Sequence, residues 1–329
     1  IMFNNSSEEN ILNKLVEPNT YNLPNTSSIM STLLIQYAII DFEQNIHLAS
    51  QEQMHFINTD LEKSMTLKAP AGSGKTSAIL LKAVLEKLKN PSLKIVIIKP
   101  TNLACDILSK KLLDTVEHAI VELDLSSIVI LTPTQFKEST PKSIDLIICD
   151  DTEFYEDTFL LSIKNSSNKR KLIFVENATS PDEYYFTETF RATNKDVFFY
   201  EANEHAKVLQ IVSSLLLTCQ AKDILIVSTP LTRQKLQDDF DEFIESDSVE
   251  IDSTQSLINQ NFNHILLANY DDTVSLEAKY VLLMDIALID VKKLEYAYSL
   301  CSQSVYIVYD MESENLELLR NNFESNKNT

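Results

Sequence analysis

From Met65 onward the chain alternates between short apolar runs and longer amphipathic stretches. In the first half the apolar, β-rich runs are 65–69, 93–100, 127–133, 144–150 and 171–177. Helical patterns separate several of them, notably Thr76–Lys89 and Asn102–Val116. Continuous apolar strands joined by crossover helices are typical of a parallel sheet covered on both faces. This half is therefore predicted to form one α/β domain.

A second series of the same kind follows. Its apolar runs are 223–228, 264–270, 279–285 and 304–310, and the helical patterns between and after them lie at about 230–245, 290–301 and 311–325. The repetition of the rhythm predicts a second parallel sheet rather than an extension of the first. The boundary is expected near 180–200, after the loop Thr179-Ser180-Pro181.

The first 45 residues have a different composition from the rest. They are rich in Asn and Ser, contain Pro18 and Pro24, and lead into an apolar stretch that predicts an amphipathic helix near Ile29–Phe42. This segment either packs on its own domain or docks a partner, and the sequence leaves both open. The predicted domains are 1–45 as an arm with a helix, 46–180 as the first domain and 181–329 as the second.

Composition limits the functions that this chain can have. The formal net charge of the 329 residues is −20 and the pI about 4.6, which opposes non-specific attraction to nucleic acid or anionic lipid. Contact with nucleic acid would need a local basic groove or a partner. The four cysteines are widely separated, so neither a zinc site nor a disulfide framework is indicated. The polar, acidic opening and the lack of a long apolar span predict a cytoplasmic protein with no membrane contact.

Glycine occurs only twice, and both residues lie in the octapeptide APAGSGKT, Ala69–Thr76. The octapeptide follows a predicted strand and opens a predicted helix, the context of a phosphate-binding loop. Two glycines allow the backbone to turn its N–H groups around a phosphate at a helix N-terminus. Lys75 would reach the β- and γ-phosphates, and the Thr76 hydroxyl would hold Mg²⁺. The predicted phosphate contacts are Ala71, Gly72, Ser73, Gly74, Lys75 and Thr76.

An acidic pair follows another apolar run. Asp150 and Asp151 end the sequence IDLIICD, where a magnesium-binding Asp and a water-orienting acid are expected in a P-loop NTPase. We expect the strand that carries them to lie beside the strand of the phosphate loop. The predicted metal ligands are Thr76 and Asp150.

At this point the chain resembles the superfamily 1 helicases of the UvrD/Rep/PcrA type. APAGSGKT resembles their first motif, DDTEF their DExxD-type motif, TETFRAT their "NYRS" motif, SLEAKYVLLMD their "KGLEF" segment and LEYAYSLCSQSVYIV their "YVALTRAKxxLYIV" segment. The resemblance spans about residues 48–310 with the motifs in order. It implies two tandem RecA-like domains that bind ATP and Mg²⁺, without the large accessory insertions of those helicases.

The resemblance also implies roles for single residues. Gln53 would read adenine, with Gln51 as the alternative, and Phe190 would stack on the base. Arg191 would contact the γ-phosphate across the domain cleft, and Glu277 would contact the ribose. Single-stranded DNA would be touched by Thr101, Asn102 and Thr134. The residues expected to carry catalysis are Lys75, Asp150, Asp151 and Arg191.

Several positions depart from the family pattern. Leu300 stands at the arginine-finger position, Asp151 replaces the catalytic Glu with a shorter acid, and Glu153 stands in place of a Gln. The Gln that ends the third motif is at or near Thr179, and the Lys-Gly of the fifth motif are Val274-Ser275. The phosphate cradle of the first domain is therefore retained, whereas most of the second domain's trigger residues are missing.

Two functions follow from this combination and remain open. The first is an ATP-binding UvrD-like helicase or translocase core with weak or partner-dependent hydrolysis. It would act as a subunit of a larger nucleic-acid-processing or defence complex, with a protein partner such as a nuclease. The second is a catalytically inactive, helicase-like scaffold for protein assembly. A small-molecule kinase is disfavoured, because no lid or acceptor site is recognisable.

Overall fold

The computed structural model describes residues 38–40, 46–61, 64–118, 123–139, 143–165, 170–177, 184–187, 189, 195–201, 204–243, 250–252 and 264–327. The chain divides into two compact units. Unit 1 consists of Ile1–Pro100 with Leu108–Glu188, and unit 2 of Thr101–Ile107 with Thr189–Thr329. The α/β class and the two parallel sheets predicted from the sequence are confirmed.

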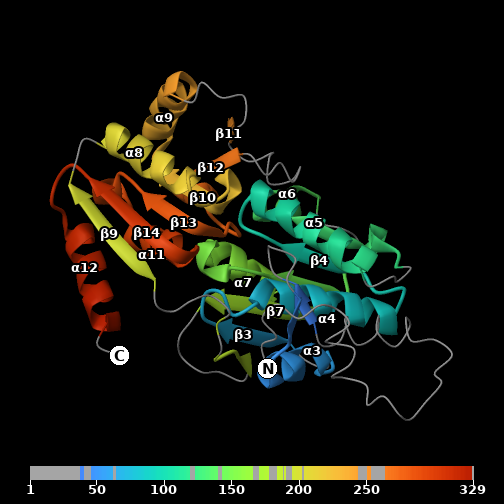
Figure 1. The fold of residues 1–329 in the computed structure, drawn as a ribbon. Helices are drawn as coiled ribbons and strands as arrows, with labels where there is room; N and C mark the ends of the chain where they lie inside the picture. Colours follow the sequence, from blue (N-terminus) through green and yellow to red (C-terminus); the bar gives the residue numbers. More distant parts are fainter. Residues whose placement is uncertain are drawn as a thin grey trace, which may run out of the picture. The chain divides into compact units, whose positions relative to one another are not determined.

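Unit 1 is built on a six-stranded sheet with the strand order β5-β4-β6-β7-β3-β8. Its strands are β3 (Met65–Ala69), β4 (Ile95–Ile98), β5 (Ile128–Leu131), β6 (Leu146–Cys149), β7 (Lys171–Asn177) and β8 (Tyr184–Tyr185). Of these, β4, β7 and β3 are labelled in Figure 1. All neighbouring strands are parallel, so their carboxyl ends meet at one edge of the sheet. Charged and polar residues that directly follow these strands are thereby brought together.

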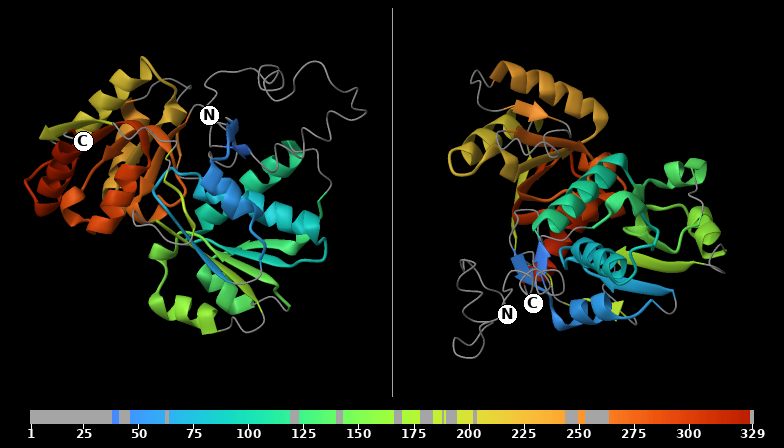
Figure 2. Two further views of the ribbon diagram at one scale, coloured as in Figure 1. Left: turned by 90° about the horizontal axis from the view of Figure 1, so that it is seen from below. Right: turned by 90° about the vertical axis from the view of Figure 1, so that its right-hand side faces the viewer.

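Helices cover both faces of this sheet. The crossovers through α4 (Lys75–Lys89) and α5 (Asn102–His118) carry the chain from β3 toward β5, and those through α6 (Pro133–Ser139) and α7 (Asp157–Asn165) carry it back. Because parallel crossovers are right-handed, the reversal of direction places the two pairs of helices on opposite faces (Figure 2). Phe136, Phe159 and Ile163 of α6 and α7 fill one apolar layer with the β4, β6 and β7 side chains.

A further helix, α3 (Gln51–Asn58), precedes the sheet. Ser50 and Gln53 form a reciprocal capping box that begins it. At its other end the fully buried ammonium of Lys82, from α4, donates to the carbonyls of Ile57 (3.2 Å) and Thr59 (2.6 Å). Burial lowers the pKa of Lys82. These contacts fix α3 on α4, the helix that follows the phosphate loop.

Unit 2 repeats the architecture with the strand order β11-β12-β10-β13-β14-β9, again parallel throughout. The strands are β9 (Asp196–Glu201), β10 (Ile224–Ser228), β11 (Glu250–Asp252), β12 (His264–Asn269), β13 (Ala278–Leu283) and β14 (Cys301–Tyr309). The helices are α8 (Glu204–Leu216), α9 (Pro230–Phe243), α11 (Val291–Ser299) and α12 (Glu314–Lys327).

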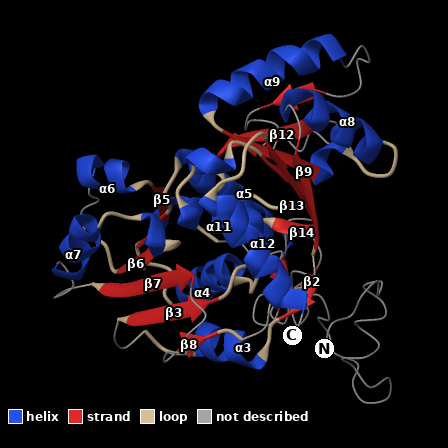
Figure 3. Ribbon diagram, turned by 90° about the vertical axis from the view of Figure 1, so that its left-hand side faces the viewer, coloured by secondary structure: helices blue, strands red, loops and turns tan. Residues whose placement is uncertain are grey.

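Two apolar layers sandwich this second sheet. Leu236 and Phe240 of α9 pack with α8 on one face, and Leu294 and Ala297 of α11 pack with α12 on the other (Figure 3). Alternate residues of β10 and β12 enter alternate layers, as the period of two in a strand requires. Within the described residues, no helix is long and apolar enough to cross a membrane.

The prediction of a helix near Ile29–Phe42 is wrong for the residues of that range that the structure describes. Ala38–Ile40 forms β1, which pairs antiparallel with β2 (Ile46–Leu48). The β-branched Ile39 and Ile40 favour an extended backbone when a partner strand is close in sequence. The remainder of that predicted arm and helix, and the loop Thr179-Ser180-Pro181, lie outside the described residues.

Candidate nucleotide site

The loop between β3 and α4 has the backbone conformation that its two glycines were expected to allow. Gly72 has φ 74° and Gly74 has φ 77°, both in the left-handed region, where a Cβ is disfavoured. Gly74 is the N-cap of α4 and brings no side chain to cap it. The loop therefore turns directly into a helix N-terminus, which carries partial positive charge and favours an anion.

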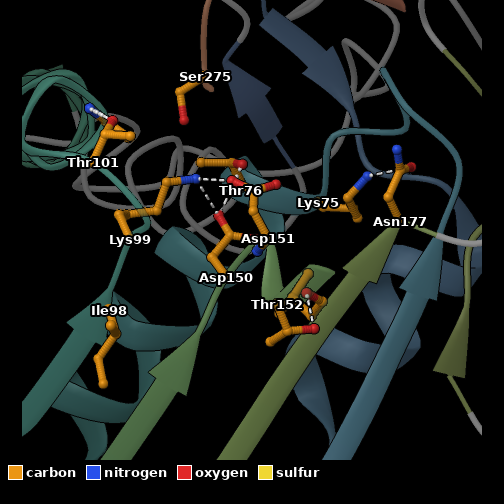
Figure 4. Close-up of polar contacts among 12 residues, drawn as sticks. Lys75, Thr76, Ile98, Lys99, Thr101, Asp150, Asp151, Thr152, Asn177 and Ser275 are labelled. Atoms are coloured by element: carbon orange, nitrogen blue, oxygen red, sulfur yellow. Dashed lines mark hydrogen bonds and ion pairs between the residues drawn. The ribbon is translucent and has the colours of Figure 1, made fainter. Parts of the chain in front are cut away.

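Lys75 is the first residue of α4, and its side chain folds back over the loop. Its Nζ donates to the carbonyls of Ala69 (3.3 Å) and Pro70 (3.1 Å) and to Asn177 Oδ1 (3.3 Å) at the end of β7 (Figure 4). The side chain is 8% exposed. This buried ammonium lies next to the loop, so an anion bound there would gain a cationic partner.

The acidic pair follows β6, a strand that is not adjacent to β3, the strand that leads into the loop. We expected Asp150 and Asp151 to follow a strand beside β3, and this is wrong: β6 pairs with β7, and β7 pairs with β3. Strand order depends on long-range pairing, which a local pattern does not encode. The parallel sheet still brings the ends together, and Thr76 Oγ1 donates to Asp150 Oδ2 at 3.1 Å.

Lys99 is the site residue that the sequence reasoning missed. It directly follows β4, is fully buried, and its Nζ lies 2.9 Å from Asp150 Oδ2 and also pairs with Asp151 Oδ2 (Figure 4). The signal was present in the sequence, since a lysine closes the otherwise apolar run IVIIK, just before Pro100. A charge at the end of a buried strand needs a partner, and the next strand of the sheet ends in Asp150.

The carboxylates sit in a strongly perturbed environment. Burial raises the pKa of Asp150, the Asp151 carboxylate raises it further, and the Lys99 ammonium opposes both. Asp151 has φ 54° and begins a short 3-10 turn, Thr152–Phe154. Glu153 keeps solvent contact, yet protein atoms surround it closely enough that desolvation, with Asp151, raises its pKa to about 7.

Gln53, predicted to read adenine, lies against the phosphate loop. It is 1% exposed, and its Nε2 donates to the Ser73 carbonyl at 2.6 Å. Gln51, the alternative, is exposed. Of this pair it is therefore Gln53 that contacts the loop. The neighbouring Glu52 accepts from Thr187 N and Oγ1, both at 2.8 Å, and so holds the segment that follows β8.

Of the residues predicted to touch single-stranded DNA, Thr101 has a local structural role and the other two are exposed. Thr101 caps α5 by accepting from Ala104 N at 3.1 Å, and Asn102 is exposed at the first position of that helix. Thr134 is exposed in the first turn of α6. Its neighbour Gln135 forms a capping box with Thr132. None of these contacts tests a role in binding nucleic acid.

In unit 2 the structure describes several positions at which the resemblance places trigger residues. Leu300, at the arginine-finger position, is 1% exposed and belongs to the apolar layer under α11 and α12. Val274, at the lysine position, is 2% exposed. Ser275, at the glycine position, keeps φ 73° although it carries a Cβ. Glu277 is half-buried before β13. Phe190, Arg191 and Thr179 lie outside the described residues.

Comparison with known proteins supports the architecture. No protein-family model matches the chain, and no curated protein matches it in sequence. Among solved structures, S. cerevisiae Dbp5 bound to RNA and ADP BeF3 matches with a TM-score of 0.63 and 12% identity, over 92% of this chain and 91% of that chain. The fold is that of a tandem RecA-like helicase core. At such identity the match shows the fold alone.

Two larger proteins match in the same way. The DUF1998 helicase MrfA bound to DNA has a TM-score of 0.61 and 11% identity, over 85% of this chain and 48% of that one. The Escherichia coli DEAH/RHA helicase HrpB has a TM-score of 0.55 and 13% identity, over 79% and 42%. The chain thus spans about half or less of these two proteins. These matches support a helicase-like core but not the UvrD/Rep/PcrA assignment, which stays a prediction.

Proposed function

We propose that this chain is an ATP-binding, helicase-like core whose nucleotide site is the loop Gly72–Thr76. One observation carries the proposal: both glycines of the chain hold positive φ in one loop, which opens α4 beside the ammonium of Lys75. The loop N–H groups and Lys75 would bind the phosphates, and Gln53 would approach the adenine from α3. When bound, ATP supplies the phosphoanhydride bond that a motor of this fold uses.

Turnover is proposed to be weak or dependent on a partner. Asp151, at the position of the water-orienting acid, is paired with Lys99, and Leu300 is part of an apolar core. A missing arginine finger costs about 10³–10⁵ in rate in related NTPases. We therefore favour a subunit of a larger nucleic-acid-processing or defence complex, of the UvrD-like type, with single-stranded DNA or a nuclease among its expected partners.

The alternative is a helicase-like scaffold that assembles proteins without using nucleotide. The buried Leu300 and Val274 favour it, because they make unit 2 apolar where a coupled motor carries charge. The two functions differ in whether the loop Gly72–Thr76 binds and uses a nucleotide.

Binding of a fluorescent ATP analogue to the full chain separates them. Lys75→Ala removes the loop's ammonium and should lower affinity about 10- to 100-fold, because a charge-assisted hydrogen bond contributes about 1.5–3 kcal/mol. Lys235→Ala removes an exposed lysine of α9 and serves as the matched control. Equal affinity of the wild type and Lys75→Ala would contradict the proposed site.

Phosphate release is then measured with and without single-stranded DNA. A proposed motor core releases phosphate slowly, faster with DNA or partner, and loses this activity in Asp150→Asn. ATP binding without release in any of these conditions would favour the scaffold.

A further inference from the structure

The most unusual feature of the site is the ammonium group of Lys99, which lies between the two carboxylates. Lys99 Nζ lies 2.9 Å from Asp150 Oδ2 and also pairs with Asp151 Oδ2. The side chains of Lys99 and Asp150 are fully buried, and that of Asp151 is 9% exposed. An ion pair this well buried is held by the fold rather than formed by chance at the surface.

The backbone fixes Lys99 in this position. Ile98 pairs with Cys149 in the β4–β6 register, so the next residues, Lys99 and Asp150, leave the sheet side by side. Lys99 N donates to the Leu131 carbonyl at 3.0 Å, and Asp150 N donates to the Ile98 carbonyl at 3.1 Å. The backbones of Lys99 and Asp150 are thus both held by hydrogen bonds that continue the sheet pattern beyond the ends of β4 and β6. The Lys99 side chain is directed away from the apolar layer that receives Val96 and Ile98.

The oxygens of Asp150 are already occupied. Oδ2 accepts from Thr76 Oγ1 (3.1 Å) and from Lys99 Nζ, and Oδ1 accepts from the backbone N of Asp151 (3.1 Å). Mg²⁺ requires oxygen ligands at about 2.0–2.1 Å in near-octahedral geometry and gives up its water reluctantly. A Mg²⁺ ion at this carboxylate would have to displace the ammonium or lie beside a like charge. The residues present therefore do not fit the predicted Mg²⁺ site.

The ammonium offsets one of the two carboxylate charges. Two carboxylates buried next to each other repel, and either a divalent cation or an ammonium relieves that repulsion. Lys99 is attached to the chain, so its local concentration does not depend on the metal content of the solution. It lies at the same strand edge as Lys75, and Thr76 links the two through Asp150.

We propose that Lys99 takes the place of the divalent cation, so that this site binds the nucleotide phosphates without Mg²⁺. The inference rests on the proposed nucleotide function of the loop and specifies the form of ligand that it takes: metal-free nucleoside triphosphate. Lys75 then provides positive charge toward the phosphates, and Lys99 reduces the negative charge of the two carboxylates beside them.

The test compares ATP affinity of the full chain in excess EDTA and in excess Mg²⁺, by calorimetry. For the wild type we expect dissociation constants within about threefold of each other, a difference well below one decade of affinity. In Lys99→Met, which keeps an unbranched side chain one atom shorter and removes the charge, affinity in EDTA should fall at least about tenfold and return when Mg²⁺ is added. Lys235→Met, an exposed lysine-to-methionine change, should behave as the wild type.

A second readout does not involve nucleotide. Mg²⁺ alone should leave the thermal midpoint of the wild type unchanged and raise that of Lys99→Met, because an ion that binds only the folded state stabilises it. If Lys99→Met does not fold, the double variant Lys99→Met/Asp151→Asn restores the net charge of the cluster and should show the same Mg²⁺ dependence. The wild-type comparison stands without any variant.

The outcomes separate the two proposals. Wild-type binding that falls tenfold or more in EDTA overturns the role of Lys99 and leaves the nucleotide site intact. Binding that is metal-independent in both the wild type and Lys99→Met also overturns it, because another group would then supply the charge. If ATP binds in neither condition, the proposed nucleotide function itself is contradicted.

Discussion

The two units share one architecture and differ at the edge where their strands end. In unit 1 that edge carries a buried ionic cluster, in which Lys99 pairs with Asp150 and Asp151. In unit 2 the comparable acid, Asp285, is used as a helix cap: Oδ2 accepts from Thr229 N and Oγ1, both at 2.8 Å, and Oδ1 accepts from Thr232 Oγ1 at 3.0 Å. One carboxylate accepts from Thr76 beside the candidate phosphate loop, and the other only begins α9.

The difference shows that the parallel sheet does not by itself specify a site. A fold of this kind brings the residues after each strand together, and their chemistry decides what the edge can do. Unit 1 places two lysines, a threonine and two acids there. Unit 2 has an acid used as a helix cap at that edge, and the apolar Val274 and Leu300, which precede β13 and β14, extend its core. The following predictions test this contrast, in order of decreasing expected effect.

The largest effect is expected from Leu300→Arg, which introduces the arginine that the UvrD-type resemblance leads one to expect at this position. Because Leu300 is 1% exposed in an apolar layer, the new charge would be buried without a partner. We expect a loss of about 3–5 kcal/mol in the free energy of unfolding, measured by urea denaturation.

Leu217→Arg is the matched control, because Leu217 is 86% exposed and should tolerate the change. Equal stability of Leu300→Arg and the wild type would show that position 300 opens toward solvent. The buried-core explanation for the missing arginine would then be wrong.

A smaller effect on stability is expected from Gly74→Ala in unit 1. At φ 77° a Cβ costs about 1–2 kcal/mol, and the methyl group would also obstruct the approach of a phosphate to the loop. Unfolding and ATP titration should therefore both report the change, with affinity reduced at least about tenfold. Unchanged affinity would mean that this backbone conformation is not needed for binding.

The smallest effect is expected from Ser275→Gly in unit 2. Ser275 has φ 73°, and its buried hydroxyl has no hydrogen-bond partner in the described part of the chain. Glycine would remove both penalties and should raise the free energy of unfolding by about 0.5–1 kcal/mol.

Ser275→Ala separates the two causes, because it removes the hydroxyl and keeps the Cβ at positive φ. A gain as large as that of Ser275→Gly would assign the whole effect to the hydroxyl. A loss of stability in Ser275→Gly would show that the serine is retained for its packing.

Much of the fold follows from local patterns. The ranges predicted for β3 and β7 agree with the structure, and α4 begins one residue before its predicted start at Thr76. In contrast, the alternating strand β9, the two-residue β8 and the helix α8 were not predicted, because short or half-exposed elements carry a weak periodic signal. The β1 strand was taken for a helix because its partner was not visible in a local window.

The candidate site also has one part that followed from the sequence and one part that only the tertiary structure decided. The sequence alone determined the conformation of the candidate phosphate loop, since its strand end, two glycines, lysine and threonine are contiguous and each has a conformational or ionic reason to be there. Only the tertiary structure decided that Lys99, fifty-one residues from Asp150, is its buried partner. That pairing depends on the β4–β6 register, and the place of β7 between β3 and β6 depends on long-range pairing as well. Local composition carries no record of which strand ends become neighbours, because that choice is made by the packing of the whole sheet.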